Sequence, residues 1–143
     1  MKAQVRGEIG SRRAARENAL ELGYEQEMRG LTTEELFATL VVPADDLTVQ
    51  LLVDAERHRV QADGLIAGAS DHWDLHRMAL MDLTLLRIAV AELIEGKTPT
   101  GVVIAEAVYL TGLFSAEESS RFVNGVLGAI SRQLQSGASD PLA

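Results

Sequence analysis

The most informative stretch of this sequence for fold and function is FSAEESSRFVNGVL, at residues 114–127. It begins like a helix, because Ser115 lies three residues before Glu118 in the S-x-x-E arrangement that satisfies free amides at a helix N-terminus. Asn124 and Gly125 then interrupt an apolar run, where glycine costs about 1 kcal/mol relative to alanine and an amide side chain needs a partner. Local rules broken in this way are usually found at functional or strained sites, so this helix is expected to do more than pack.

The helical period divides this segment into two faces. The polar face carries Arg121, Asn124 and Gly125, with Gly128 one turn further on. The apolar face, which can enter a core, consists of Phe122, Val123, Val126, Leu127 and Ile130. Two interpretations of the polar face stay open: contact with a ligand, or close packing of a second helix against the glycines.

A second unusual segment, SRRAARE at residues 11–17, places three arginines at the expected start of a helix capped by Ser11. Positive charge there opposes the helix dipole, and arginines three or four residues apart repel one another. Free amides at a helix N-terminus attract anions, and guanidinium groups bind phosphate well. Arg12, Arg13 and Arg16 are therefore candidate phosphate contacts, with a merely solvated helix face as the alternative.

Composition limits the class of protein. The 143 residues suit one domain, and 47% hydrophobic residues with three prolines suit a compact, mostly helical fold. Cysteine is absent, which removes disulfides and thiolate zinc sites, and no run of about 18 apolar residues could span a bilayer. We therefore expect a cytoplasmic protein that does not enter a membrane.

Charge is distributed unevenly along the chain. The net charge is −8, yet residues 1–16 carry a local charge of +4, which leaves −12 for the remainder. The basic end could hold RNA, whereas the acidic remainder would repel RNA and attract a basic partner such as a ribosomal protein.

Apolar periodicity and capping signals predict an all-α protein of about seven helices without strands. The expected helices cover residues 11–28, 32–40, 44–70 (one long helix or two abutting ones), 73–80, 81–95, 101–113 and 116–136. Thr32 and Glu35 form a further capping box. Residues 1–10 are expected to form a flexible arm, residues 11–136 one compact domain, and residues 137–143 a frayed tail.

Segment 81–95 is apolar on all sides and is expected to be the central buried helix. Arg87 interrupts it, and because a buried charge is costly unless paired, we expect this arginine to bind an acidic group. His72 and His76 could share a metal, but Trp73 stands where an H-E-x-x-H motif requires glutamate. We therefore predict no metal, no cofactor and no catalytic site, so the chain is not expected to be an enzyme.

Five motifs, in the same order, resemble the NusB family of bacterial transcription antitermination factors. They are SRRAARE at 11–17, WDLHRM at 73–78, MDLTLLRIAVAEL at 81–93, VIAEAV at 103–108 and RFVNGVL at 121–127. The resemblance covers about residues 11–135 and implies an all-α RNA-binding domain of two three-helix subassemblies. It also implies a factor that binds the single-stranded boxA element of ribosomal RNA transcripts. Its implied partners are the ribosomal protein NusE and the RNA polymerase antitermination complex.

Matching positions carry the family's contacts over to this chain. The residues implied to contact RNA are Arg12, Arg13, Arg16, Phe114, Glu118, Arg121, Phe122 and Asn124, and those implied to face NusE are Tyr24 and Asp82. Arginines follow an RNA backbone, and an exposed aromatic ring can stack a base for about 1–3 kcal/mol. Two positions depart from the family pattern: Gly23 stands where a large apolar residue is usual, and Glu118 replaces the commoner aspartate. We therefore expect a partner to supply part of the RNA affinity.

Two other functions are compatible with the sequence. A NusB-like fold also precedes the catalytic domain of ribosomal RNA cytosine methyltransferases, although this sequence has no Gly-rich cofactor-binding segment. The net charge of −8 also suits a protein-only adaptor that has lost RNA binding. A homodimer stays open as well, since a helical surface that receives a partner can pair with itself.

Overall fold

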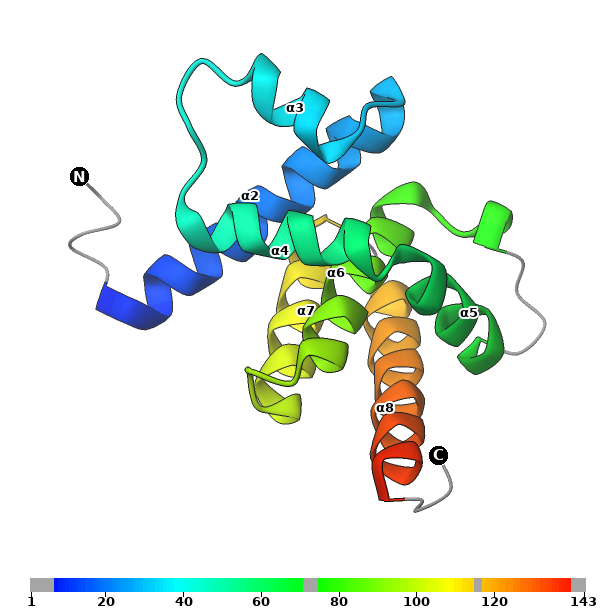
Figure 1. Ribbon diagram of the computed structural model, residues 1–143. Coiled ribbons are helices and arrows are strands. Elements are labelled where there is room, and N and C mark those ends of the chain that lie inside the picture. Colours follow the sequence, from blue (N-terminus) through cyan, green and yellow to red (C-terminus); the bar gives the residue numbers. More distant parts are fainter. Residues whose placement is uncertain (1–6, 71–74, 115–116, 140–143) are drawn as a thin grey trace.

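The computed structural model describes residues 7–70, 75–114 and 117–139. Within these ranges the chain forms seven α-helices and one 3-10 turn and contains no strand, which confirms the predicted all-α class (Figure 1). The elements are α2 (Gly7–Arg29), α3 (Thr33–Thr39), α4 (Asp46–Arg57), α5 (Arg59–Ala69), the turn η1 (Leu75–Arg77), α6 (Leu80–Glu95), α7 (Thr100–Phe114) and α8 (Glu117–Ser139).

Two hydrophobic clusters organise the helices. The first lies between α2, α3 and α4; it contains Leu36, Leu51 and Leu52, and Ile88 of α6 contributes to it. The second lies between α5, α6, α7 and α8, and Leu86 of α6 is fully buried in it. The first subassembly thus has the three helices that the resemblance implies, whereas α5 joins α6, α7 and α8 in the second.

Helix α6 is the centre of the molecule, as its apolar sequence predicts. It packs against α2, α4, α5, α7 and α8, and its side chains Leu86 and Val90 have no exposed surface (Figure 1). It ends at Gly96, whose φ of +71° is the left-handed conformation that glycine adopts without strain. The relative positions of α2, α7 and α8, which carry most of the predicted contact residues, are therefore set by their packing on α6.

Two helix boundaries agree with the sequence prediction, the start of α3 and the junction between α4 and α5. Thr32 Oγ1 accepts a hydrogen bond from the amide of Glu35, whose carboxylate accepts one from the amide of Thr32, so the predicted capping box is confirmed. The segment 44–70 forms two abutting helices, α4 and α5, which meet at His58. The short helix expected at 73–80 is present in its described part only as the 3-10 helix η1, Leu75–Arg77, before α6 begins at Leu80.

The outer ends of the first and last helices differ from the prediction. Helix α2 begins at Gly7 rather than at Ser11, and α8 continues to Ser139 rather than ending at 136. Ser11 therefore lies inside α2 and does not cap it. The helix dipole acts most strongly in the first turn, and the three arginines lie beyond that turn. The predicted unfavourable interaction of their charges with the dipole is therefore largely removed.

Two features discussed from the sequence lie outside the described ranges: the cap expected at Ser115, and His72 of the histidine pair for which no metal is predicted. Among the residues that the structure describes, no helix has the length and apolar character needed to cross a membrane. The same described ranges contain no group of three or more His, Cys, Asp or Glu side chains that could hold a metal ion.

Candidate nucleic-acid interface

Arg13 lies on α2 and connects it to α7. Its Nε and Nη2 donate hydrogen bonds to the two carboxylate oxygens of Glu106, at 3.2 and 2.8 Å, and this hydrogen bonding lowers the pKa of Glu106. The guanidinium carbon also lies 3.9 Å from the centroid of the Tyr109 ring, within the range of a cation–π contact. The Arg13 side chain is still 40% exposed, so its guanidinium is held in place and stays accessible to a phosphate.

Arg16 lies about one turn further along α2 and is buried. Its Nε and Nη2 donate to the two carboxylate oxygens of Glu92 on α6, at 2.9 and 3.0 Å, and the two side chains are only 8% and 10% exposed. The predicted phosphate contact of Arg16 therefore needs a correction, because its guanidinium is committed to a carboxylate inside the protein. In this position Arg16 holds α2 on α6 and thereby helps to position Arg13.

The basic face of α2 thus consists of Arg12, which is exposed, and Arg13. Sequence reasoning missed the glutamates that hold the arginines, because Glu92 and Glu106 lie 76 and 93 residues away along the chain. One signal was present: Glu106 is the single charged residue of α7, and a lone charge in an apolar helix points to a partner elsewhere.

The amino-terminal half of α8 presents the second part of the predicted interface. Arg121, Asn124 and Gly125 are exposed, and a Cβ atom built on Gly125 would meet nothing within 4 Å. On Gly128 such an atom would meet only Arg132 of the same helix. No other helix of the described residues therefore packs closely against these glycines, and the polar face around Gly125 is open within the described part of the chain. The opposite face is buried, as predicted, through Val123, Val126, Leu127 and Ile130.

A hollow of about 280 Å³ lies where α6 and α8 begin. Its walls are Arg77, Met78, Ala79, Asp82, Glu118, Ser119 and Phe122. It brings together Glu118 and Phe122, implied to contact RNA, with Asp82, implied to face NusE. Asp82 is 8% exposed and accepts a hydrogen bond from Ser119 Oγ at 2.9 Å, which ties the start of α6 to the start of α8. A partner seated at this hollow would therefore touch both predicted surfaces.

Two further predicted contact residues, Phe114 and Tyr24, lie outside this hollow. Phe114 ends α7 and packs, partly buried, against the second hydrophobic cluster. Tyr24 lies on α2 and is half-buried. The structure therefore distributes the predicted residues over α2, α6, α7 and α8, and gathers three of them at one hollow.

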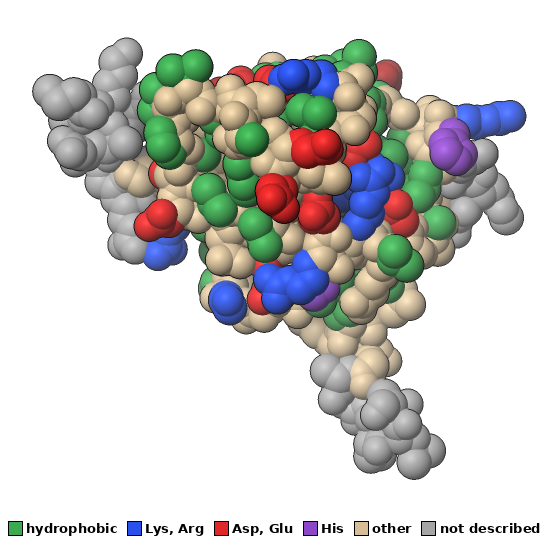
Figure 2. Space-filling view, turned by 45° about the horizontal axis from the view of Figure 1, so that its top comes forward, with side chains coloured by type: hydrophobic (Ala, Val, Ile, Leu, Met, Phe, Trp, Pro, Cys, Tyr) green, Lys and Arg blue, Asp and Glu red, His purple; other side chains and the backbone are tan. Residues whose placement is uncertain are grey.

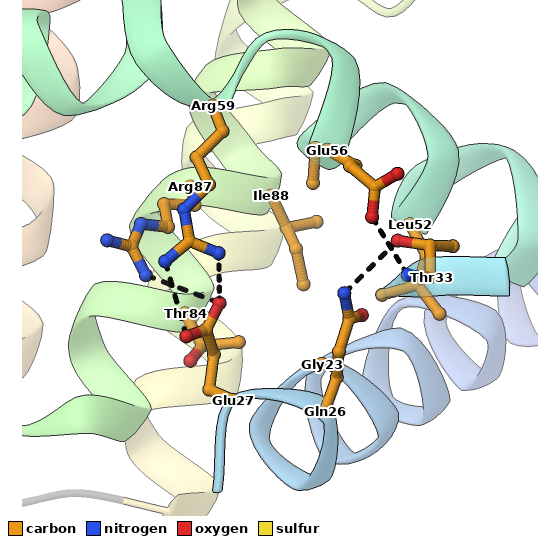
Figure 3. A pocket seen from close by; sticks show the side chains of 11 residues that line it. Gly23, Gln26, Glu27, Thr33, Leu52, Glu56, Arg59, Thr84, Arg87 and Ile88 are labelled. Carbon is orange, nitrogen blue, oxygen red and sulfur yellow. Dashed lines mark hydrogen bonds and ion pairs between the residues drawn. The ribbon is translucent and has the colours of Figure 1, made fainter. Parts of the chain in front are cut away.

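Ion pairs connect α2, α5 and α6, and they account for the presence of the charged Arg87 in the apolar helix α6. Its Nε and Nη2 donate to the two oxygens of Asp63, at 2.7 and 3.1 Å, and its Nη1 lies 3.6 Å from Glu27 Oε1. Figure 3 shows Arg59 and Arg87 converging on Glu27. The predicted structural role of Arg87, bound to an acidic group, is confirmed.

Gly23 lines a small cavity of about 40 Å³ beside these ion pairs (Figure 3). A Cβ atom on Gly23 would lie 3.0 Å from Thr84 Cγ2 and 3.4 Å from Leu52 Cδ2. Helix α2 thus comes too close to α4 and α6 for the large apolar residue that the resemblance implies at this position. The departure is a feature of helix packing in this chain.

Most basic side chains of the described ranges have an acidic neighbour. Those within 4 Å of a carboxylate oxygen include Arg13, Arg16, Arg29, Arg57, Arg59, Arg87 and Lys97. Figure 2 accordingly shows basic and acidic side chains interspersed on one face, without a continuous patch of one sign there. On this face, any contact with an anion would therefore depend on individual arginines and not on an extended basic patch.

Comparison with known proteins agrees with this architecture. The NusB family model matches residues 13–132. The transcription antitermination protein NusB of Thermobifida fusca is 39% identical over 126 residues, which cover 85% of this chain and 89% of that protein. The protein of the same name from Solibacter usitatus is 34% identical over 134 residues, with 88% and 92% covered.

Solved structures give the same result. The solution structure of NusB from Aquifex aeolicus is similar with a TM-score of 0.76 and 30% identity, and 90% of this chain and 93% of that chain are covered. A crystal structure of the antitermination factors NusB and NusE in complex with dsRNA contains a chain that is similar with a TM-score of 0.75 and 30% identity. That match covers 88% of this chain and 99% of the other. The chain belongs to the NusB family.

Proposed function

We propose that this protein is a transcription antitermination factor that binds boxA-type single-stranded RNA together with the ribosomal protein NusE. The proposal rests on family membership and on similarity to NusB chains that were crystallised with NusE and RNA. It acts in the cytoplasm as a binding protein and not as an enzyme, in keeping with relatives that are named antitermination proteins.

The observation that carries the RNA side of the proposal is the open polar face of α8. Gly125 lowers helix propensity and brings no packing gain, since a Cβ there would meet nothing within 4 Å. Its exposed neighbours Arg121 and Asn124 supply a cation and an amide, which suit a phosphate and a base edge. Arg12 and Arg13 on α2 extend this surface. Arg16 does not belong to it, but its buried ion pair with Glu92 holds α2 in position on α6.

The NusE side of the proposal rests on the hollow between α6 and α8. Two acidic side chains, Asp82 and Glu118, line it against one basic side chain, Arg77, and this excess of negative charge suits a basic ribosomal protein. Phe122 and Met78 supply apolar surface in the same hollow. Tyr24 would extend the NusE contact along α2.

Fluorescence anisotropy with labelled boxA RNA, with and without purified NusE, tests the proposal. A scrambled single strand of equal length is the control for non-specific charge attraction. We expect the pair to bind boxA more tightly than this chain alone does, because two adjacent surfaces then share one ligand. No association with NusE and no gain in RNA affinity would contradict the proposal.

Asp82→Asn tests the NusE side separately. The amide oxygen can still accept the hydrogen bond from Ser119, so the fold should survive, while the negative charge is lost. We expect weaker NusE binding with unchanged thermal unfolding. Unchanged NusE affinity would remove Asp82 from the interface.

A protein-only adaptor is the second candidate. It is favoured by the net charge of −8 and by the pairing of Arg13 and Arg16 with glutamates, which reduces the positive potential on α2. NusE binding without any RNA binding by the pair, in the same titration, would select this function.

A further inference from the structure

Tyr109 combines exposure with a bound cation. Its ring belongs to α7 and is 40% exposed, the largest exposure of any aromatic side chain in the described ranges. Arg13 lies over this ring, with 3.9 Å between the guanidinium carbon and the ring centroid. Two hydrogen bonds to Glu106 fix the guanidinium in that position. The ring is thus held next to one of the two arginines of the basic face of α2.

Tyr109 lies on the helix that contacts both helices of the proposed RNA surface, because α7 packs against α8 and is bound to α2 through Arg13 and Glu106. Helix α7 carries an exposed, uncharged stripe made of Val102, Ala105, Tyr109, Gly112 and Leu113. At 1.5 Å per residue, Tyr109 lies roughly 7 Å along the helix axis from Phe114, after which α8 and its polar face follow. A strand that runs from Arg13 to α8 along α7 would therefore pass over the Tyr109 ring.

We infer that Tyr109 stacks a nucleobase of the bound single-stranded RNA on the ring face opposite Arg13, and that Arg13, over the other face, holds an adjacent phosphate. This inference rests on the proposed function, and it assigns a base contact to a residue that the sequence motifs did not single out. Every base has a π-face, so such a platform binds a single strand without demanding one sequence. The cation on the ring also fixes its orientation before RNA arrives.

A second copy of this chain is the competing occupant of the stripe. The stripe from Val102 to Leu113 is roughly 17 Å long and one helix wide, or on the order of 200 Å². A stable protein interface needs about 800 Å² on each partner. The stripe alone is therefore too small for a dimer, whereas one base needs only the ring.

The test compares Tyr109→Leu with Tyr109→Phe in the complex with NusE and boxA RNA. We expect Tyr109→Leu to bind RNA about tenfold more weakly, with an unchanged dependence on salt, because stacking releases no counterions. Tyr109→Phe should bind within about twofold of the unmodified protein, since phenylalanine stacks equally well. Val102→Ala, on the same stripe but without a ring, is the matched control and should change nothing.

A second measurement does not depend on a variant. BoxA RNA that carries 5-iodouridine should photo-crosslink to the peptide containing Tyr109 in the unmodified complex. Sedimentation velocity of the unmodified chain and of Tyr109→Leu detects self-association through the stripe.

The possible outcomes separate the two proposals. Unchanged RNA affinity in Tyr109→Leu, or no crosslink at Tyr109 while the unmodified complex binds RNA, overturns this inference and leaves the proposed function standing. A concentration-dependent dimer that Tyr109→Leu dissociates, without loss of RNA affinity, also overturns it. If the unmodified chain with NusE binds no RNA at all, the proposed function and this inference fail together.

Discussion

Replacing Arg16 with alanine tests whether a buried ion pair holds α2 on α6. The two side chains are 8% and 10% exposed and share two hydrogen bonds, at 2.9 and 3.0 Å. Removing the guanidinium leaves the Glu92 carboxylate buried without its cation, which typically costs about 3–5 kcal/mol. Since each kcal/mol shifts the Tm of a domain of this size by about 2–4 °C, we expect the Tm to fall by roughly 6–20 °C.

Arg13→Ala is the matched control on the same helix. The Arg13 side chain is 40% exposed, whereas its partner Glu106 is 13% exposed, so water reaches this ion pair from the arginine side only. We therefore expect Arg13→Ala to lower the Tm, but by less than Arg16→Ala does, because both members of the Arg16 pair are buried. For RNA affinity we expect the reverse order: if Arg13 contacts a phosphate as proposed, Arg13→Ala flattens the salt dependence by about 0.7 log units per log unit of salt.

Thermal unfolding followed by circular dichroism, and RNA affinity at several salt concentrations below the Tm, measure both effects. Glu92→Gln is a second variant that breaks the same pair from the other side and should cost a similar free energy of unfolding. The reasoning is refuted if Arg16→Ala keeps its Tm and flattens the salt dependence as Arg13→Ala does. In that case Arg16 reaches the phosphate directly, and something other than this ion pair holds α2.

Three further predictions concern stability. Gly125→Ala should raise the free energy of unfolding by about 1 kcal/mol, because alanine favours a helix and its methyl group would meet no protein atom within 4 Å. The same methyl group would occupy the open face of α8 and should weaken RNA binding. Urea titration measures the stability and fluorescence anisotropy the RNA affinity; an unchanged affinity would remove Gly125 from the interface. Gly23→Ala should lower the free energy of unfolding by about 1–3 kcal/mol, because its Cβ would lie 3.0 Å from a methyl group of α6. Gly64→Ala, with open space around it, is the control and should stabilise the helix, and equal effects in urea unfolding would contradict the packing argument. The hydrogen bond from His58 lowers the pKa of Glu95, so its contribution to stability is complete above the ordinary value near 4.5 and is lost as the pH falls through the lower folded value. Glu95→Gln should therefore flatten the decline of Tm below about pH 4.5, and an unchanged decline would show that other carboxylates dominate.

The features that the sequence predicts well are those set by neighbours along the chain. The capping box at Thr32 depends on two residues three positions apart, and both hydrogen bonds are present. The apolar run at 81–95 can only be stable when surrounded, which is why α6 lies at the centre. A charge inside such a run requires a partner, and Arg87 has Asp63.

The start of α2 could not be predicted in the same way. Gly7 and Gly10 have low helix propensity, and Ser11 is a favourable cap, so local preference alone favours a later start. The helix nevertheless begins at Gly7. Propensity is a weak preference of about 1 kcal/mol per glycine, and structure beyond the local sequence can override it.

The roles within the arginine cluster depend on residues from distant helices. Spacing shows only that Arg12, Arg13 and Arg16 lie close together on α2. The packing of α2 decides which of them is buried: Arg16 pairs with Glu92 on α6, and Arg13 pairs with Glu106 on α7. The same packing brings Tyr109 under Arg13, a contact that no local pattern indicates.

These pairings make the basic end of the chain less basic than its sequence indicates. Residues 1–16 carry +4, but Glu106 and Glu92 offset the charges of Arg13 and Arg16, and the remainder of the chain carries −12. Phosphate contacts supply most of the sequence-independent affinity for RNA, so this chain alone has little of it to offer. We expect its contribution to lie instead in fixed positions: Arg13 held against α7, the exposed face of α8 around Gly125, and the hollow where α6 and α8 begin. A basic protein seated at that hollow would add positive charge beside those residues, and for this reason we expect the two proteins together to bind RNA more tightly than this chain does alone.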